Sequence, residues 1–267
     1  MTLPDSYLAI QTSLRALGRV AVAFSGGVDS TLLLKVAADT LGPSHVLAVI
    51  GDSPSLPRRE KSDAEDLAAG MGVELVVVPT GEMDNPQYAA NPRNRCYYCK
   101  QMLMAAVSKQ AAARGITAVL DGQNADDRSD WRPGSQAARE CGVRSPLQEA
   151  GLTKADIRLL SESLGLPTSR KPAMACLASR LPYGTPVTPA ALRQIEAAEQ
   201  SLQDAGFATV RVRHHGTVAR IEIDPEEVPR LLDPSTRLRI STAVKAAGFT
   251  FVALDLDGYR TGSLNSP

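Results

Sequence analysis

The sequence predicts an α/β protein: a parallel β-sheet covered by helices on both faces, followed by a smaller α+β domain. Over the first 180 residues, apolar β-branched runs alternate with amphipathic segments, an order typical of a parallel sheet with helical crossovers. A proline- and glycine-rich joint at residues 181–189 interrupts this alternation, and the order of elements changes beyond it. We therefore expect two domains, residues 1–181 and 182–267.

Each element follows from its residue pattern. The predicted strands of the first domain are short apolar runs, at residues 20–24, 46–50, 73–78 and 116–120. The predicted helices have apolar residues at helical spacing, near residues 31–41, 58–70, 98–114 and 153–164. Beyond the joint we expect a helix at 190–205, strands at 208–214, 218–223 and 249–255, and helical segments at 225–232 and 238–247.

Six residues, Ser25-Gly26-Gly27-Val28-Asp29-Ser30, lie between the first predicted strand and the first predicted helix. The glycines let the backbone approach an anion closely, the serines add hydroxyl donors, and the helix start supplies N–H groups and the positive end of its dipole. The segment matches neither G-x-x-x-x-G-K-[ST] nor G-x-G-x-x-G. It resembles the PP-loop of the ATP pyrophosphatases, which cleave ATP between the α and β phosphates. We expect all six residues to bind ATP; an ordinary glycine turn is the alternative.

Two further segments are expected beside this loop. Ligands on parallel sheets bind outside the carboxyl ends of the strands. Gly51-Asp52-Ser53 follows the second predicted strand, and Asp121-Gly122-Gln123-Asn124 follows the fourth. We therefore place Gly122 in the ATP site.

Acidic residues near the loop are candidates for holding Mg²⁺. Asp29 suits a magnesium ligand or a group near the transferred phosphate, although an acidic residue there also complements the helix dipole. Asp126, with Asp127 beside it, offers oxygen ligands, or else forms a solvated acidic turn.

Composition restricts the partners. Lysine plus arginine and aspartate plus glutamate both number 29, so the formal charge is zero and non-specific nucleic-acid binding is not favoured. No apolar stretch approaches the length that spans a bilayer, and the first residues lack the basic-then-apolar order of a signal peptide. We therefore expect a cytoplasmic protein without nucleic-acid or membrane partners. Its four cysteines are better interpreted as chemical groups than as a disulfide scaffold.

Cys176 lies just ahead of the joint, where a loop could face a cleft. Its neighbours Lys171 and Arg180 could lower the thiol pKa and so raise the thiolate fraction. An inert core cysteine is the alternative.

The other cysteines have no single interpretation. Cys96 and Cys99 have the spacing of half a zinc knuckle or of a redox pair, but no second C-x-x-C follows. With Cys141 and Cys176 they would supply four thiolates for a zinc or iron–sulfur site, provided that the fold joins three separate segments.

Six ordered motifs resemble those of the LarE family over nearly the whole chain. They are residues 25–30 (SGGVDS), 91–100 (NPRNRCYYCK), 121–127 (DGQNADD), 132–134 (RPG), 144–147 (RSPL) and 176–184 (CLASRLPYG), and residues 255–265 (DLDGYRTGSLN) extend the match. LarE proteins are ATP-dependent sulfur transferases of nickel-pincer cofactor synthesis. The resemblance implies the PP-loop fold, which is like that of the adenine nucleotide α-hydrolases.

The resemblance also implies a three-part reaction. ATP, with Mg²⁺, adenylates a carboxylate of pyridinium-3,5-dicarboxylic acid mononucleotide; a cysteine thiolate attacks the mixed anhydride; and the carbon–sulfur bond of that cysteine breaks. The product is a thiocarboxylate and the protein keeps dehydroalanine. A thiolate cannot displace the carboxylate oxygen until it becomes a leaving group, and AMP is a good one. Cys176 matches the sulfur-donor position, and Ser179 and Arg180 in the same motif are expected in the catalytic site.

Some members of the family instead hold an iron–sulfur cluster on additional cysteines shortly after this position. No cysteine follows Cys176 here, so we expect no iron–sulfur cluster and a sacrificial sulfur donor. The C-x-x-C pair is then either structural or helps to shape the substrate cleft, for which we expect Arg95, Tyr97 and Lys100.

The second domain offers further candidates. Alternation places Arg211 and Arg213 on one face of a predicted strand, where they could meet a phosphate of the mononucleotide or a neighbouring subunit, or form a solvated basic face. Glu222 should point away from the apolar face, and with Glu196 and Glu199 it is a candidate site for a divalent metal.

The family's hexamers suggest that the small domain mediates self-association as a homohexamer, and a nickel-insertion protein would act downstream. A tRNA thiolase or an amide-forming synthetase would use the same loop. The neutral charge argues against the first. The second needs ammonia from a glutaminase partner or domain, and no such domain fits in this chain. A nucleotide-binding regulator without turnover is the alternative outside enzymes, and it would tolerate loss of Cys176.

Overall fold

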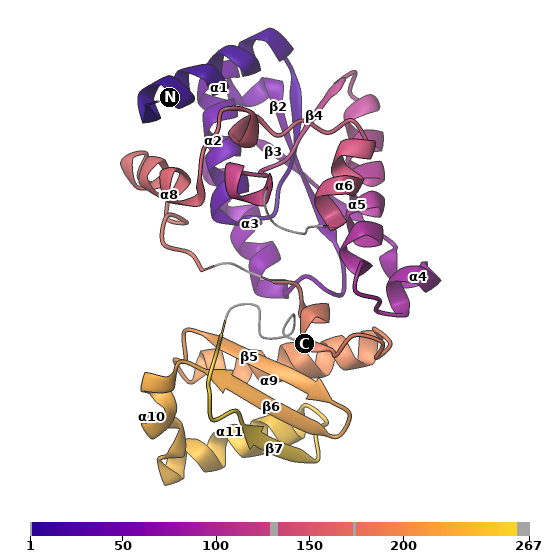
Figure 1. Ribbon diagram of the computed structural model, residues 1–267, viewed down its shortest axis with the longest axis vertical. Helices are drawn as coiled ribbons and strands as arrows, with labels where there is room; N and C mark the ends of the chain where they lie inside the picture. The colour runs from indigo at the N-terminus through magenta and orange to yellow at the C-terminus, as the bar shows by residue number, and fades with distance from the viewer. Residues whose placement is uncertain (1, 129–132, 173–174, 261–267) are drawn as a thin grey trace. The chain divides into compact units, whose positions relative to one another are not determined.

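The computed structural model describes residues 2–128, 133–172 and 175–260 and divides the chain into two compact units (Figure 1). The first unit consists of Met1–Asn85 and Asn94–Met174. The second consists of Pro86–Arg93 and Ala175–Pro267, so it includes a short segment from much earlier in the chain.

A four-stranded parallel sheet forms the centre of the first unit. Its strands are β1 (Val20–Ala23), β2 (Val46–Asp52), β3 (Glu74–Pro79) and β4 (Ala118–Leu120), in the order β3-β2-β1-β4. All four predicted strands are present, with ends shifted by up to two residues. The chain builds outward from β1 to β3 and then returns to the other side of β1, so the strand order reverses between β1 and β4. In such sheets ligands bind at this reversal, beyond the carboxyl ends of the strands.

Helices cover both faces of this sheet (Figure 1). Along β1, Val20 and Val22 join the core that includes one group of helices, whereas Ala21 and Ala23 join the core that includes the other. The first group is α1 (Leu3–Leu17), α2 (Val28–Leu41), α3 (Arg58–Gly70), α7 (Pro146–Glu149) and α8 (Lys154–Ser163); the second is α5 (Arg95–Ala112) and α6 (Pro133–Glu140). The predicted α/β class is confirmed.

The second unit has its own sheet and core. Strands β5 (Val210–His215) and β6 (Val218–Ile223) are antiparallel, and β7 (Phe251–Leu254) pairs with β6 in parallel. The helices of this unit are α4 (Pro86–Ala89), α9 (Pro189–Asp204), α10 (Val228–Leu232) and α11 (Pro234–Ala246), with the 3₁₀ helix η4 (Leu177–Arg180). Leu202, Val212 and Ile221 pack with α11 in the core, so the alternate residues of β5 and β6 lie on the opposite face of the sheet.

Asn91 attaches the early segment to the second unit. Its side-chain amide donates to the carbonyl oxygens of Pro182 and Thr185, at 2.8 and 2.9 Å, and its own carbonyl accepts from the N–H of Gly184. Asn91 is fully buried and has a φ of 55°, a conformation that asparagine tolerates better than most residues. Hydrogen bonds to backbone groups therefore attach this segment to the predicted joint.

Candidate active site

The phosphate loop connects β1 to α2 in a compact turn. Gly26 has a φ of 69°, and a Cβ there would lie 3.0 Å from the Cβ of Ala64 on α3. The Ser30 hydroxyl lies 3.1 Å from that of Ser25 and donates to the carbonyl of Gly27 at 3.2 Å. The turn thus holds both serine hydroxyls at the start of α2, where the helix dipole favours an anion.

Gly122 brings the loop after β4 against this helix start. A Cβ at Gly122 would lie 2.9 Å from the nitrogen and 3.1 Å from the Cα of Ser30. The contact involves backbone, which cannot rotate away as a side chain can. The two loops on either side of the strand-order reversal therefore touch because residue 122 is a glycine.

A cavity of about 230 Å³ opens at this place. Residues from β1, the phosphate loop, α5 and the loop after β4 line it: Ala23, Phe24, Ser25, Asp29, Ser30, Lys100, Leu103, Asp121, Gly122, Gln123 and Asp127. Hydroxyl groups, a lysine ammonium and carboxylates around the cavity are the donors and metal ligands that a nucleotide phosphate and Mg²⁺ require. The residues present therefore fit ATP with Mg²⁺.

Asp121 and Lys100 form the buried ion pair of the cavity. The Lys100 Nζ lies 3.1 Å from Asp121 Oδ2, and Asp121 also accepts from Gln123 Nε2 at 2.8 Å and from the Ser145 hydroxyl at 2.7 Å. Burial by itself would raise the pKa of Asp121, but the charge of Lys100 and these hydrogen bonds outweigh it and hold the pKa below its ordinary value. Lys100 is thus placed at the cavity by a carboxylate that stays ionised.

Asp29 faces two groups that come from distant parts of the chain. Its Oδ2 lies 2.5 Å from the Nζ of Lys154, the first residue of α8, and its Oδ1 accepts from Asn124 Nδ2 at 3.3 Å. Asp126 accepts the backbone N–H of Lys154 at 2.9 Å and so attaches the start of α8 to the loop after β4. The structure therefore brings Asp29 and Asp126, both predicted as magnesium ligands, to the same lysine.

Lys154 is a residue that sequence reasoning missed. One signal was available, because Lys154 occupies the first turn of α8, directly after the capping residue Thr153. A cation at a helix N-terminus opposes the helix dipole, so its presence there points to a role other than helix stability.

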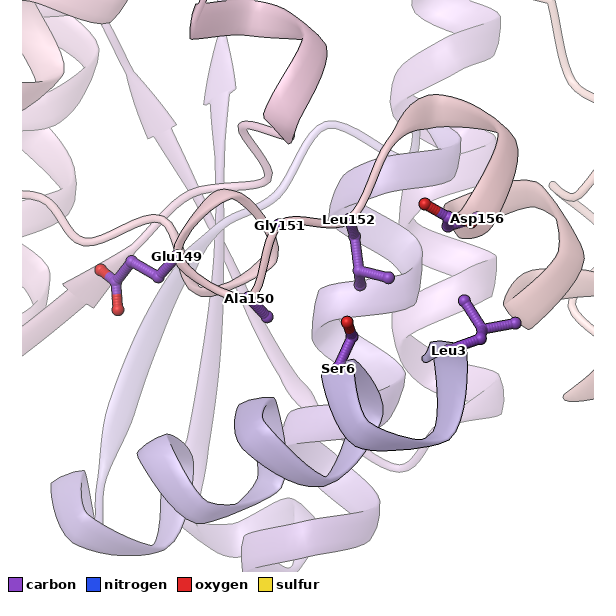
Figure 2. Close-up of a pocket in the computed structure, with 7 residues that line it drawn as sticks. All are labelled: Leu3, Ser6, Glu149, Ala150, Gly151, Leu152 and Asp156. Carbon is purple, nitrogen blue, oxygen red and sulfur yellow. The ribbon is translucent and has the colours of Figure 1, made fainter. Parts of the chain in front are cut away.

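A second cavity, of about 280 Å³, lies between α1 and the segment before α8 (Figure 2). Leu3 and Ser6 of α1 face Leu152 and Asp156 across it, and Glu149 lies at its far end. Its two carboxylates already have partners: Asp156 closes the capping box with Thr153, and Glu149 pairs with Arg144. We assign no function to this cavity.

The predicted cleft residues on α5 do not line one common site. Lys100 lines the first cavity, but the Tyr97 hydroxyl donates to Glu140 of α6 at 2.5 Å, which raises the pKa of the phenol. Arg95 is buried at the start of the helix.

The cysteines on and near α5 and α6 differ in exposure. Cys96 and Cys141 are exposed, and Cys99 is partly exposed. Within the described ranges, no three histidine, cysteine, aspartate or glutamate side chains come together in a metal-binding arrangement.

Cys176 lies in the second unit, directly before η4, and its backbone accepts a hydrogen bond from Arg180. Arg180 Nη1 donates to the carbonyls of Ala175 and Cys176, at 2.7 and 3.0 Å, and to the Ser179 hydroxyl at 3.0 Å. Glu199 of α9 holds the other side of the same guanidinium through two hydrogen bonds, at 2.8 and 2.9 Å. The three predicted catalytic residues therefore share one short turn, which these hydrogen bonds connect to α9.

Lys171, the other cation predicted near the thiol, is engaged within the first unit. Its Nζ lies 2.7 Å from Glu60 Oε2 and 3.4 Å from both the carboxylate of Asp63 and the carbonyl of Gly26. This lysine therefore contacts the phosphate loop.

Arg211 and Arg213 lie on the face of the second sheet away from its apolar core, and both are buried. Arg213 makes two hydrogen bonds to Glu222, at 2.9 and 2.7 Å, and donates to the carbonyl of Ser179 at 3.0 Å. The Arg211 guanidinium lies over the ring of Tyr259, 5.1 Å from its centre; burial lowers its pKa, and the charge of Arg180 lowers it further.

Two of the three acidic residues grouped as a divalent metal site, Glu199 and Glu222, form ion pairs with arginines. Glu222 pairs with Arg213 and Arg220, and Glu199 pairs with Arg180. A divalent metal at Glu222 would therefore have to compete with these guanidinium groups for the carboxylate.

Comparisons with known proteins find relatives that match nearly the whole chain. Residues 7–129 match the asparagine synthase family. The chain is 39% identical over 264 residues to the pyridinium-3,5-bisthiocarboxylic acid mononucleotide synthase of Lactiplantibacillus plantarum, covering 99% of this chain and 95% of the relative. It is 45% identical over 249 residues to an uncharacterised protein of Synechocystis, covering 93% and 92%, and 26% identical over 243 residues to one of Methanocaldococcus jannaschii, covering 91% of each. Within the described residues, no helix is long and apolar enough to cross a membrane.

Proposed function

Because this chain belongs to the LarE family of pyridinium-3,5-bisthiocarboxylic acid mononucleotide synthases, we propose that it transfers sulfur to a carboxylate of pyridinium-3,5-dicarboxylic acid mononucleotide. The observation that carries the proposal is the cavity at the strand-order reversal, which residues of the first three motifs line. ATP and Mg²⁺ are the co-substrates that this cavity suits.

The first step is adenylation. A carboxylate oxygen of the substrate attacks the α-phosphorus of ATP, and the bond from that phosphorus to the bridging oxygen breaks, so pyrophosphate leaves with the electron pair. The Ser25 and Ser30 hydroxyls and the start of α2 hold the phosphates, and Asp29 is the ligand that we propose for Mg²⁺. Lys100 supplies a cation beside the reacting phosphate.

The second step uses Cys176. Its thiolate attacks the carbonyl carbon of the mixed anhydride, the carbon–oxygen bond to AMP breaks, and a thioester joins the substrate to the protein. Arg180 fixes the backbone of Cys176 through two carbonyls, which limits the positions that the sulfur can take.

The third step breaks the Cβ–Sγ bond of Cys176. A base removes the Cα proton, the electron pair forms the Cα–Cβ double bond, and sulfur leaves as the thiocarboxylate of the product. Residue 176 becomes dehydroalanine, so each chain donates sulfur once. No cysteine follows Cys176 to replace it.

The buried arginines suit the phosphate of the mononucleotide. Four arginines, Arg180, Arg211, Arg213 and Arg220, share their surroundings with three carboxylates, Glu199, Glu222 and Asp255, so positive charge exceeds negative charge by one. A phosphate monoester would balance this excess through charge-assisted hydrogen bonds.

The proposal extends to partners and compartment. We propose that the protein acts in the cytoplasm, that the small domain mediates self-association as a homohexamer, and that a nickel-insertion protein uses the product downstream. Light scattering of the active protein tests the assembly: a fully active monomer at micromolar concentration would contradict it.

Product analysis tests the reaction class. We expect ATP to give AMP and pyrophosphate in the presence of the dicarboxylate substrate, and Gly27→Val to block this reaction because a branched side chain would prevent close approach of the phosphates. ADP and orthophosphate as products would refute the proposal. A nucleotide-binding regulator would release neither set of products.

A further inference from the structure

Lys154 is held from two sides, by the phosphate loop and by the loop after β4. Its ammonium pairs with Asp29, and its backbone N–H donates to Asp126. The preceding segment is fixed as well, because the carbonyl of Leu152 accepts from the N–H of Ala125 at 2.8 Å. The start of α8 therefore has a defined position relative to the start of α2.

The charge of Lys154 is unfavourable for the stability of its own helix. The capping box of Thr153 and Asp156 already satisfies the start of α8, and a cation in that turn opposes the helix dipole. Nor does the pair with Asp29 account for the lysine, because partly exposed ion pairs contribute little to stability.

Three lysines surround the loop, and they differ in accessibility. The side chain of Lys154 is 33% exposed, against 25% for Lys100 and 16% for Lys171. Lys100 is paired with the almost fully buried Asp121, and Lys171 with the buried Glu60. Lys154 is thus the most solvent-accessible of the three lysines.

We propose that Lys154 binds the β- and γ-phosphates of ATP and the pyrophosphate that leaves, an inference that rests on the adenylation proposed above. A Mg²⁺ ion bound by Asp29 would repel the Lys154 ammonium that the same carboxylate holds. The ammonium then turns to the nearby phosphoryl oxygens, which carry more charge than one carboxylate. When the bond from the α-phosphorus to the bridging oxygen breaks, Lys154 stabilises the charge that grows on pyrophosphate.

Inhibition constants for pyrophosphate and AMP provide the test. In Lys154→Met we expect the constant for pyrophosphate, and the KM for MgATP, to rise about 10- to 100-fold, the effect of losing one charge-assisted hydrogen bond. The constant for AMP should stay within about twofold, since AMP lacks those phosphates. Lys154→Arg should restore most of the pyrophosphate affinity. Lys35→Met is the matched control, because Lys35 forms a similarly exposed pair with Asp39 elsewhere on α2.

The outcomes separate this inference from the reaction itself. If the wild-type protein releases pyrophosphate but Lys154→Met binds pyrophosphate as the wild type does, Lys154 has no such role. Equal weakening of AMP and pyrophosphate would also overturn the inference, because it would show that Lys154 only maintains the loop. If the wild-type protein releases ADP, the proposed function fails first.

Discussion

Arg180 and Glu199 form a two-bond ion pair, with Nε 2.8 Å from Oε1 and Nη2 2.9 Å from Oε2, and the Arg180 side chain is fully buried. The remaining nitrogen, Nη1, donates to the carbonyl of Cys176. Glu199 therefore sets the orientation of the group that holds the backbone of the proposed sulfur donor.

Breaking this pair should impair sulfur transfer but not adenylation. In Glu199→Gln we expect pyrophosphate release to continue, because the phosphate loop is untouched, while thiocarboxylate yield falls at least tenfold. Removing one partner of a buried pair also leaves an uncompensated charge, so unfolding of the second unit should require about 3 to 5 kcal/mol less free energy.

Urea unfolding and single-turnover product analysis measure both effects. Arg170→Met is the control, since Arg170 pairs with Glu162 on the surface and such pairs contribute about 0 to 1 kcal/mol. Equal losses of pyrophosphate release and sulfur transfer in Glu199→Gln would disprove the separation.

Gly122→Ala should abolish ATP binding with little change in the far-ultraviolet circular dichroism spectrum. The added Cβ would meet the backbone of Ser30 at 2.9 Å, so the loop after β4 must move away from the start of α2. Gly70→Ala, on α3, is the matched control, because a Cβ there has no neighbour within 4 Å. Calorimetric titration with MgATP measures the difference; undiminished affinity in Gly122→Ala would show that the contact does not shape the site.

Asp121 should make stability depend on pH. Its pKa is depressed in the folded protein, so the unfolded chain binds more protons at mildly acidic pH, and the carboxylate contributes stability above about pH 4 that is lost as the pH falls through its folded pKa. We expect Asp121→Asn to lower the free energy of unfolding by about 3 kcal/mol at pH 7 and by clearly less at pH 3.5. Urea titrations at the two pH values test this; an equal deficit at both would show that the charge of Asp121 is not the cause.

Local patterns accounted for most of the fold. The apolar runs of β1 and β6 and the helical spacing of α3 predicted those elements to within a residue, because the pattern of each depends on its own sequence. The phosphate loop was also predictable, since its glycines, serines and helix start are consecutive. Sequence reasoning did not propose α1 or α6, which are amphipathic helices outside the strand–helix alternation.

Long-range partners could not be predicted. Asn91 bonds residues of the joint 91 and 94 positions later, and Lys154 reaches Asp29 across 125 positions. Strand alternation indicated the face on which Arg213 and Glu222 lie. The register of β5 and β6 places Arg211 opposite Glu222, and only the side-chain hydrogen bonds show that Glu222 pairs diagonally with Arg213. Such side-chain pairs form between segments that are distant in the sequence, so the sequence alone also allowed metal binding at Glu222 as a weaker interpretation.

The mass of the intact protein before and after a single turnover tests the central claim most directly. With ATP, Mg²⁺ and the dicarboxylate substrate, the account predicts that the chain becomes lighter by one H₂S, with the loss mapped to residue 176. Cys176→Ser should form the adenylate but no thiocarboxylate, whereas Cys96→Ser and Cys141→Ser should retain single-turnover sulfur transfer. Many turnovers on added sulfide without a change in mass, or thiocarboxylate formed by Cys176→Ser, would contradict a sacrificial cysteine.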